Sequence, residues 1–455
     1  MNWAWVELRT TRLADPRLNL RLSRMVEDLG EHPEASCTEA LGKAGAKAAY
    51  RFWDNPHVHA EEILVGHAEQ CAQRSEEYPV VLVAQDTTEI DLTGHRATQG
   101  TGYLGSANGR GLWLHTLLAI SPTGVPLGVL RQFTWTRPME QLGKRHQRRK
   151  TPLKEKESQR WLDGLTATAE ALPDHAHVVL IGDRESDIFD LFAAPRAKHV
   201  DLLVRVCRER RRVEHPAKYL NAALEREPVR GHVQIEIPAR ANRRARQAQL
   251  AVRWRSLEVH APRHGPKRPS LRLTFILVEE INPPKGEKPV RWLLATTLRV
   301  ETLEEALRCV QWYAYRWIIE RFHFVLKSGC KIEQRQLQTV ERMERAIPVF
   351  SIVAWRLLWM TLQARETPDA PCTMVLEEFE WKALWATAHP HLGQLPAVAP
   401  TLREAVRSIA RLGGFLGRKC DGEPGPQTLW RGLRRLHDLA QGWLIAQRQN
   451  QFTPR

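Results

Sequence analysis

The chain has 455 residues, which is too long for one ordinary hydrophobic core and predicts two or three domains. Hydrophobic residues make up 43% and charged residues 26% of the chain, a globular composition that excludes general disorder. The formal net charge is +15, and a surplus of that size favours a polyanionic partner, with nucleic acid first among the candidates.

Membrane and disulfide classes are not expected. Mostly apolar stretches such as residues 347–355 end at a charge, well before the roughly twenty residues that cross a bilayer. The N-terminus lacks the basic start and long apolar run of a secretory signal, so we expect a cytoplasmic protein without membrane attachment. The seven cysteines form no C-x-x-C pair and no dense disulfide pattern, so we expect no zinc site either.

Residues 1–66 are predicted to form small helices. Asp15 can cap a helix whose first residue is Pro16. A second helix is expected over residues 38–52, before the turn signal Asn55-Pro56. Leucine and methionine repeat on one face of the first helix, at Leu18, Leu22, Met25 and Leu29. Basic residues lie elsewhere on the two helices and are candidate contacts to DNA: Arg17, Arg21, Arg24, Lys43, Lys47 and Arg51. A solvated basic face is an equal alternative on these residues alone.

Buried strands indicate an α/β core from residue 79 onward. The apolar run Val80–Ala84 is typical of a buried strand, and Asp86 lies just beyond it. A second buried strand over residues 177–182 ends at Asp183. Further expected elements are strands at 112–120 and 125–130 around a turn at 121–124, a helix at 155–172 stopped by Pro173, and a strand at 200–206.

An arginine-rich segment, residues 207–290, is predicted as a β-rich insertion. Its alternating stretches indicate solvated strands at 232–237, 247–254 and 271–281. A strand at 291–294 and one long helix over 302–328 follow, and the remainder is helical and separate. The expected domains are therefore a helical N-terminal domain at 1–66, a core at 67–365 and a helical C-terminal domain at 366–455.

Three carboxylates carry the expected chemistry. Two buried strands ending at aspartates and a long helix bearing Glu320 could bring Asp86, Asp183 and Glu320 together in one mixed sheet with a packed helix. Two divalent ions on oxygen ligands, about 4 Å apart, can activate the attacking oxygen and stabilise the leaving oxygen in phosphoryl transfer. An aspartate at a strand end, taken singly, is usually a turn or cap residue, so the metal-site hypothesis depends on the combination.

The predicted long helix adds phosphate-binding groups. At about 100° per residue, the residues Tyr313, Arg316, Glu320 and Lys327 fall within an arc of about 60°. An acid among cationic and phenolic donors suits an enzyme that holds metal and grips phosphate oxygens. The alternative is a solvated face with an ordinary i,i+4 pair between Arg316 and Glu320.

The segment Tyr313-Ala-Tyr-Arg316-Trp-Ile-Ile-Glu320, followed by Lys327, resembles the YREK signature of bacterial insertion-sequence transposases. Residues 85–88 and 182–185 resemble the surroundings of that family's two catalytic aspartates. Segments 281–287 and 408–415 also resemble family segments, so the resemblance covers nearly the whole chain.

The resemblance implies a ribonuclease-H-like catalytic core with a β-rich insertion, an N-terminal domain that reads transposon ends and a C-terminal dimerisation domain. It implies two Mg²⁺ ions at the three carboxylates, with Mn²⁺ as a substitute. The implied chemistry is nicking, hairpin formation, hairpin opening and insertion into target DNA. Expected partners are double-stranded DNA and a second copy of the chain in a synaptic complex, in the bacterial cytoplasm.

The resemblance also assigns two DNA contacts. Trp292 lies 21 positions before Tyr313, as does the family tryptophan near a flipped base, which implies a stacking platform; core packing is the alternative. Arg205 matches a family arginine that contacts DNA near the active site. Two competing functions are a catalytically silent DNA-binding inhibitor of transposition and a ribonuclease-H-like nuclease. The intact carboxylates disfavour the first, and the second leaves the N-terminal module and the YREK helix unexplained.

Overall fold

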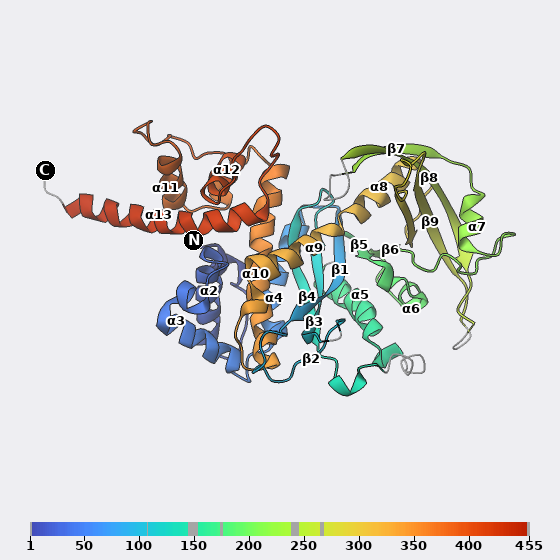
Figure 1. Cartoon of the computed structure of the whole chain (residues 1–455), viewed down its shortest axis with the longest axis horizontal. Helices are drawn as coiled ribbons and strands as arrows, with labels where there is room; N and C mark the ends of the chain where they lie inside the picture. Colours follow the sequence, from blue (N-terminus) through green and yellow to red (C-terminus); the bar gives the residue numbers. More distant parts are fainter. Residues whose placement is uncertain are drawn as a thin grey trace. The chain divides into compact units, whose positions relative to one another are not determined.

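The computed structural model describes residues 2–106, 108–143, 153–172, 176–237, 245–263 and 268–452. The chain forms two compact units (Figure 1). The first unit consists of Met1–Glu77, Thr87–Gln147 and Ile318–Arg455, and the second of Tyr78–Asp86 and Arg148–Trp317. Strand β1 (Val80–Asp91) runs through the boundary between them.

The first unit begins with four helices: α1 (Trp3–Glu7), α2 (Pro16–Glu31), α3 (Cys37–Asp54) and α4 (Ala60–Ser75). The predicted start of α2 is confirmed, because the Asp15 side chain accepts a hydrogen bond from the Arg17 N–H and Pro16 is the first helical residue. The four predicted apolar residues of α2 are buried. Helix α3 is longer than expected and bends at Gly42, whose φ of 67° breaks the helical path.

Antiparallel strands form the sheet of this unit. Strand β3 (Arg110–Ile120) pairs with β2 (Gly102–Tyr103) and β4 (Pro126–Trp135), which confirms the predicted hairpin. The later part of β1 lies against β3 so closely that a Cβ on Gly111 would be 1.9 Å from the Ile90 carbonyl oxygen. Helices α4 and α10 (Val340–Glu366) cover β4.

Helix α10 is the central core helix of the first unit. By length and apolar composition alone it could cross a membrane, but 83% of its apolar window is buried inside the protein. It contacts α2, α3 and α4, which precede it in the chain, and α12 (Leu402–Leu412) and α13 (Pro426–Phe452), which follow it. Its apolar composition is therefore accounted for by packing.

The C-terminal region is helical, as expected, with α11 (Glu378–Ala388), α12 and α13. These helices share an apolar cluster that includes Trp381, Leu402 and Leu429. Helices α12 and α13 approach so closely that a Cβ on Gly432 would lie 1.8 Å from the Ile409 carbonyl oxygen.

The second unit is a mixed sheet in the order β1-β5-β6-β10-β9-β8-β7. Strands β1, β5 and β6 are parallel, and the remaining pairs are antiparallel. The strands other than β1 are β5 (His177–Gly182), β6 (Val200–Arg205), β7 (Gly231–Ile237), β8 (Arg246–Val259), β9 (Leu271–Glu280) and β10 (Arg291–Thr296). The helices are α5 (Arg160–Ala171), α6 (Phe189–Ala193), α7 (Leu220–Glu225) and α8 (Leu303–Ala314). This arrangement confirms the α/β class.

Three strand and helix predictions need correction. Strand β1 does not end before Asp86 but continues to Asp91, because its later residues lie against β3. Strand β9 is mostly buried rather than solvated, because it lies between β8 and β10. Helix α5 begins at Arg160 instead of residue 155, after short 3-10 turns, and Pro173 lies outside the described residues.

The predicted single helix over residues 302–328 is wrong. Helix α8 ends at Ala314, α9 (Trp317–Phe324) follows after a turn, and residues Val325–Gly329 form a π-helical turn. At the end of that turn a Cβ on Gly329 would lie 2.8 Å from the Trp430 ring. The close packing of Gly329 against α13 accompanies the change of helical geometry.

Candidate active site

Asp86 and Asp183 lie on neighbouring parallel strands of the second unit. The β1–β5 register pairs Val80 with His177 and Ala84 with Ile181. Two residues further along each segment the chain reaches Asp86 and Asp183, so the pairing directs both residues to the same end of the sheet. The structure therefore brings two of the three predicted carboxylates to one edge of this sheet, where β5 ends.

A tight turn holds Asp183. Its carboxylate accepts a hydrogen bond from the Glu185 N–H at 2.8 Å, and the Ser186 hydroxyl donates to the Asp183 carbonyl at 2.7 Å. A Cβ at the preceding Gly182 would lie 2.2 Å from the Ser186 Oγ, so this close approach requires glycine. The strand end thus fixes the backbone of Asp183 while its side chain remains half-buried.

Two arginines lie beside these carboxylates. Arg316 Nη1 is 3.8 Å from Asp86 Oδ2. The β5–β6 register pairs Gly182 with Val204, so one further residue places Arg205 opposite Asp183. Arg205 also donates to the Arg291 carbonyl at 3.4 Å, from β6 to β10. Arg316 therefore lies beside the Asp86 carboxylate, and Arg205 is on the strand next to Asp183.

Tyr313 and Trp292 extend this group of residues. Their rings meet edge to face with centroids 5.7 Å apart. Burial raises the pKa of the Tyr313 phenol, the guanidinium groups of Arg316 and Arg205 oppose that rise, and the Asp183 carboxylate adds to it. Tyr313 is 4% exposed, whereas Trp292 is half-buried. The phenol therefore stays protonated and can donate a hydrogen bond.

Glu320 and Lys327 belong to the first unit. Glu320 is exposed in the first turn of α9. Lys327 lies in the π-helical turn, and its Nζ is 3.0 Å from Glu333 Oε1. The uniform arc predicted for residues 313–327 is wrong, because the helix breaks after Ala314 and changes its period at Val325.

Sequence reasoning missed a buried support behind Asp183. Asp187 is 1% exposed, forms an ion pair with Arg211 and accepts hydrogen bonds from the N–H groups of Cys207 and Arg208, at 2.9 and 3.0 Å. It ties the turn after β5 to the chain after β6. The only available signal was a second aspartate four residues after Asp183, which alone is weak.

The residues present fit a hard divalent cation. Asp86 and Asp183 supply carboxylate oxygens, the donors that Mg²⁺ and Mn²⁺ prefer. Arg205, Arg316 and the Tyr313 hydroxyl are hydrogen-bond donors of the kind that phosphate oxygens accept. The second unit thus combines candidate metal ligands with hydrogen-bond donors suited to phosphate.

The predicted DNA-contacting residues of the N-terminal helices differ in their surroundings. Arg17 is 88% exposed and paired with Asp15 at 2.7 Å. Lys43, Lys47 and Arg51 of α3 are exposed. These three residues, with Tyr50 and Arg342, line part of a shallow surface depression. Helix α3 therefore presents a basic, partly aromatic surface.

Three family models match the chain, in the order of its domains. A transposase DNA-binding domain matches residues 1–58, a transposase DDE domain residues 149–349, and a transposase Tn5 dimerisation domain residues 352–451. The DDE match contains Asp183 and Glu320, and Asp86 precedes it. This domain has the ribonuclease-H-like fold and performs metal-dependent DNA cleavage and transfer. The chain therefore belongs to the Tn5-type DDE transposases and carries their DNA-binding, catalytic and dimerisation domains.

Proposed function

We propose that this transposase binds the inverted repeats at transposon ends, excises the element through a hairpin intermediate and inserts it into target DNA. Asp86, Asp183 and Glu320 are the proposed catalytic carboxylates and the ligands of two Mg²⁺ ions, with Mn²⁺ as a substitute. The observation that carries this proposal is the placement of Asp86 beside Asp183, with Arg316 and Arg205 next to them.

The assignment of Glu320 rests on chain continuity and on the signature. Glu320 follows Arg316 by four residues, and Arg316 pairs with Asp86. The YREK residues are Tyr313, Arg316, Glu320 and Lys327. Their spacing resembles that of the transposase of the kanamycin-resistance composite transposon.

The bound ions would activate the attacking oxygen and stabilise the leaving oxygen in each strand cleavage or joining step. Arg316, Arg205 and Lys327 hold the phosphate oxygens, and the protonated Tyr313 hydroxyl donates to one of them. Trp292 supplies a ring on which a base flipped from the hairpin stacks. Trp292 packs against Tyr313 but is only half-buried, so part of its ring surface is accessible.

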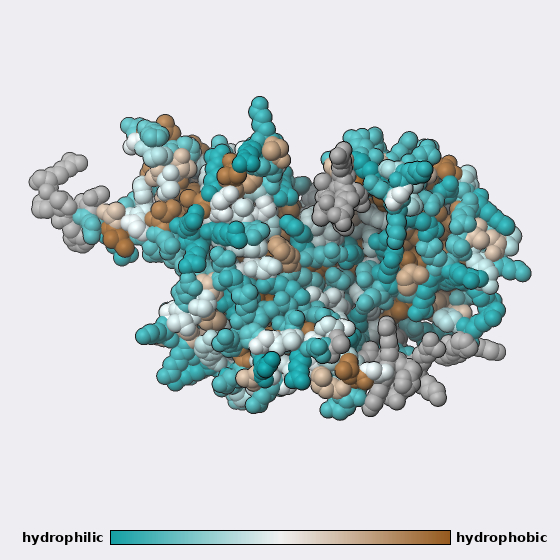
Figure 2. Space-filling view, in the orientation of Figure 1, coloured by the Kyte–Doolittle hydropathy of each residue, from teal (hydrophilic) through white to brown (hydrophobic). Residues whose placement is uncertain are grey.

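We propose three domains: residues 1–66 read the transposon ends, 67–365 form the catalytic core, with the insertion at about 207–290, and 366–455 dimerise. In the N-terminal domain, α2 and α3 supply the proposed DNA contacts. In the C-terminal domain, α13 carries exposed apolar residues, Leu439 at 37% and Ile445 at 56%. Figure 2 shows apolar patches over this helix on an otherwise mostly hydrophilic face. Such a surface suits the dimer contact of a synaptic complex in the bacterial cytoplasm.

The experiment that tests this function incubates purified protein with Mg²⁺ and end-labelled DNA carrying the repeats that flank its gene. Denaturing gels resolve nicked, hairpinned and joined products. Scrambled repeats and an RNA–DNA hybrid are the matched substrates. We expect double-strand breaks and hairpinned ends only with intact repeats.

Two outcomes favour other functions. Repeat binding without cleavage in either Mg²⁺ or Mn²⁺ favours a catalytically silent inhibitor of transposition. Cleavage of the hybrid irrespective of repeats favours a ribonuclease-H-like nuclease. Neither outcome is compatible with an end-specific transposase.

A further inference from the structure

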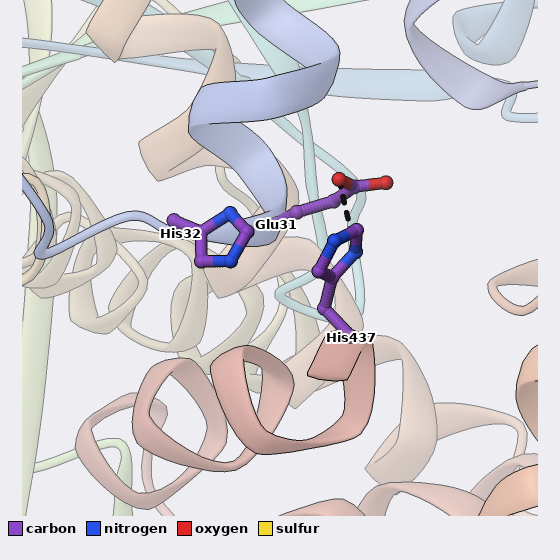
Figure 3. Close-up of side chains that lie close together, drawn as sticks. All are labelled: Glu31, His32 and His437. Carbon is purple, nitrogen blue, oxygen red and sulfur yellow. Dashed lines mark ion pairs between the residues drawn. The ribbon is translucent and has the colours of Figure 1, made fainter. Parts of the chain in front are cut away.

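A cluster of ligand-type side chains in the first unit takes no part in the proposed catalytic site. We propose that Glu31, His32 and His437 bind a divalent transition-metal ion, best matched by Zn²⁺, that clips α2 to α13. Figure 3 shows these three side chains gathered where the end of α2 meets α13. Among the described residues, they are the group of three potential ligands whose atoms all lie within 4.8 Å of one another.

The three side chains need to approach one another only slightly to bind one ion. His437 Nδ1 is 2.9 Å from Glu31 Oε2, and the rings of His32 and His437 meet edge to face with centroids 4.6 Å apart. Ligands around a tetrahedral zinc ion lie about 3.3 Å from one another. Rotations of these side chains can therefore bring two imidazole nitrogens and one carboxylate oxygen onto one ion.

One imidazole nitrogen at the proposed site is a buried polar atom without a hydrogen-bond partner among the described residues. His32 Nδ1 is buried and has no hydrogen-bond partner within the described parts of the chain. A buried polar atom without a partner is unfavourable, and such atoms often mark a missing ion or water. A bound metal would satisfy this nitrogen. The ion pair of Glu31 with His437 alone leaves it unsatisfied.

The surroundings favour a cation although the whole chain is basic. Glu27, Asp28, Asp438 and Glu380 add negative charge around the three proposed ligands. A divalent cation would reduce the repulsion among these carboxylates.

The site is accessible and its donors select the metal. Glu27, Glu31 and His437 line part of a cavity of about 750 Å³. Two of the three proposed ligands, Glu31 and His437, therefore face a cavity from which a water molecule can reach the ion as fourth ligand. Two imidazoles and one carboxylate suit Zn²⁺, whereas Mg²⁺ prefers oxygen ligands alone. The site would therefore stay selective in the Mg²⁺ that the proposed catalysis requires.

The residue types and their positions explain why no sequence motif predicted this site. The cysteines argued against zinc, and no cysteine is involved here. His32 and His437 come from opposite ends of the chain, so they form no spacing motif. The ion would join a helix of the DNA-binding match to one of the dimerisation match.

The test measures metal binding in the full-length protein. The background carries Asp183→Ala, so that ions at the proposed catalytic carboxylates are not counted. Protein freed of metal with chelator is dialysed against Zn²⁺ in millimolar Mg²⁺ and its metal content is measured. Co²⁺ titration then reports coordination through its visible absorption. The variants are His32→Ala, His437→Ala and Glu31→Gln, and His391→Ala, which changes an exposed histidine, is the matched control.

We expect about one Zn²⁺ per chain in the background protein and in the His391→Ala control. Each ligand variant should weaken binding at least tenfold and abolish the Co²⁺ absorption. Zinc should also raise the Tm of the background protein but not that of Glu31→Gln, which keeps the size of the side chain. Absent zinc binding, or binding that the three ligand variants leave unchanged, overturns the proposal.

Discussion

Arg316 Nη1 lies 3.8 Å from Asp86 Oδ2, and both side chains are only 18% exposed. A guanidinium so close to a proposed metal ligand stabilises the carboxylate as an anion. The same group is placed to bind a phosphate oxygen of a DNA strand held at the metals. Arg316 thus links the proposed metal ligands to the proposed phosphate-binding residues.

Arg316→Gln should slow strand cleavage by about 10²-fold at saturating Mg²⁺, because a charged donor to the reacting phosphate is lost. The Mg²⁺ concentration for half-maximal rate should not rise, since no metal ligand is removed. Single-turnover cleavage at several Mg²⁺ concentrations measures both quantities. Arg316→Lys should recover part of the rate, and a higher Mg²⁺ requirement in Arg316→Gln would assign the residue to organising the metal site instead.

Trp292→Ala should slow hairpin formation roughly tenfold or more, because stacking on a flipped base is lost, and should slow the first nick much less. Time courses on strand-labelled DNA separate the two steps. Trp292→Phe keeps an aromatic face and should restore much of the rate. Equal slowing of both steps, together with a lower Tm, would mean that Trp292 serves only to pack against Tyr313.

Lys43, Lys47 and Arg51 lie exposed on α3. Their combined substitution by Gln should reduce the slope of log K against log salt by about one for each lost phosphate contact. The same applies to Arg17, Arg21 and Arg24 on α2. Fluorescence anisotropy with repeat DNA at several salt concentrations measures the slope. Gln substitutions at the exposed residues Arg418 and Lys419 serve as the control, and an unchanged slope removes the substituted helix from the DNA interface.

Glu7 anchors a buried polar network between α1 and α4, 2.6 Å from His67 Nδ1 and 2.8 Å from Arg74 Nη2. Burial alone would raise the pKa of Glu7, but His67 and Arg74 hold it at about 2. A carboxyl group whose pKa is lower in the folded than in the unfolded protein stabilises the fold at pH values above its unfolded pKa, about 4.3. This contribution to stability is lost as the pH falls toward 2.

Glu7→Gln should therefore lower the free energy of unfolding by about 3 kcal/mol at pH 7. The difference from the natural protein should shrink steadily below pH 4.5. Urea unfolding at a series of pH values measures it, and Glu76→Gln at an exposed position is the control. A difference that stays constant down to pH 3 would show that the charge of Glu7 does not stabilise the fold.

Local sequence patterns predicted most of the strands and two of the N-terminal helices, α2 and α3. The apolar run Val80–Ala84 locates β1 but not its end, because β1 continues only where it lies against β3. Local patterns also failed to predict the helix break after Ala314 and the π-helical turn at Val325–Gly329. The π-helical turn accompanies the packing of Gly329 against Trp430, which is a tertiary contact.

In the candidate site, too, local patterns predicted some residues and missed those that depend on tertiary packing. Strand ends and the spacing of Tyr313, Arg316, Glu320 and Lys327 predicted Asp86, Asp183 and the residues around them as site residues. The pairing of Asp187 with Arg211 joins segments that follow different strands, and no periodicity signals it. The gathering of Glu31, His32 and His437 likewise depends on how α2 and α13 pack.

In the proposed function, Asp86, Asp183 and Glu320 form one metal-dependent active site. The most direct measurement is the rate of the first nick on repeat DNA in Mg²⁺ for Asp86→Asn, Asp183→Asn and Glu320→Gln, with repeat binding measured in parallel. Glu185→Gln, at an exposed neighbour of Asp183, is the control. We predict that each of the three variants loses at least about 10³-fold in rate while binding is retained and the control stays active. Near-normal cleavage by any one of the three would contradict the account.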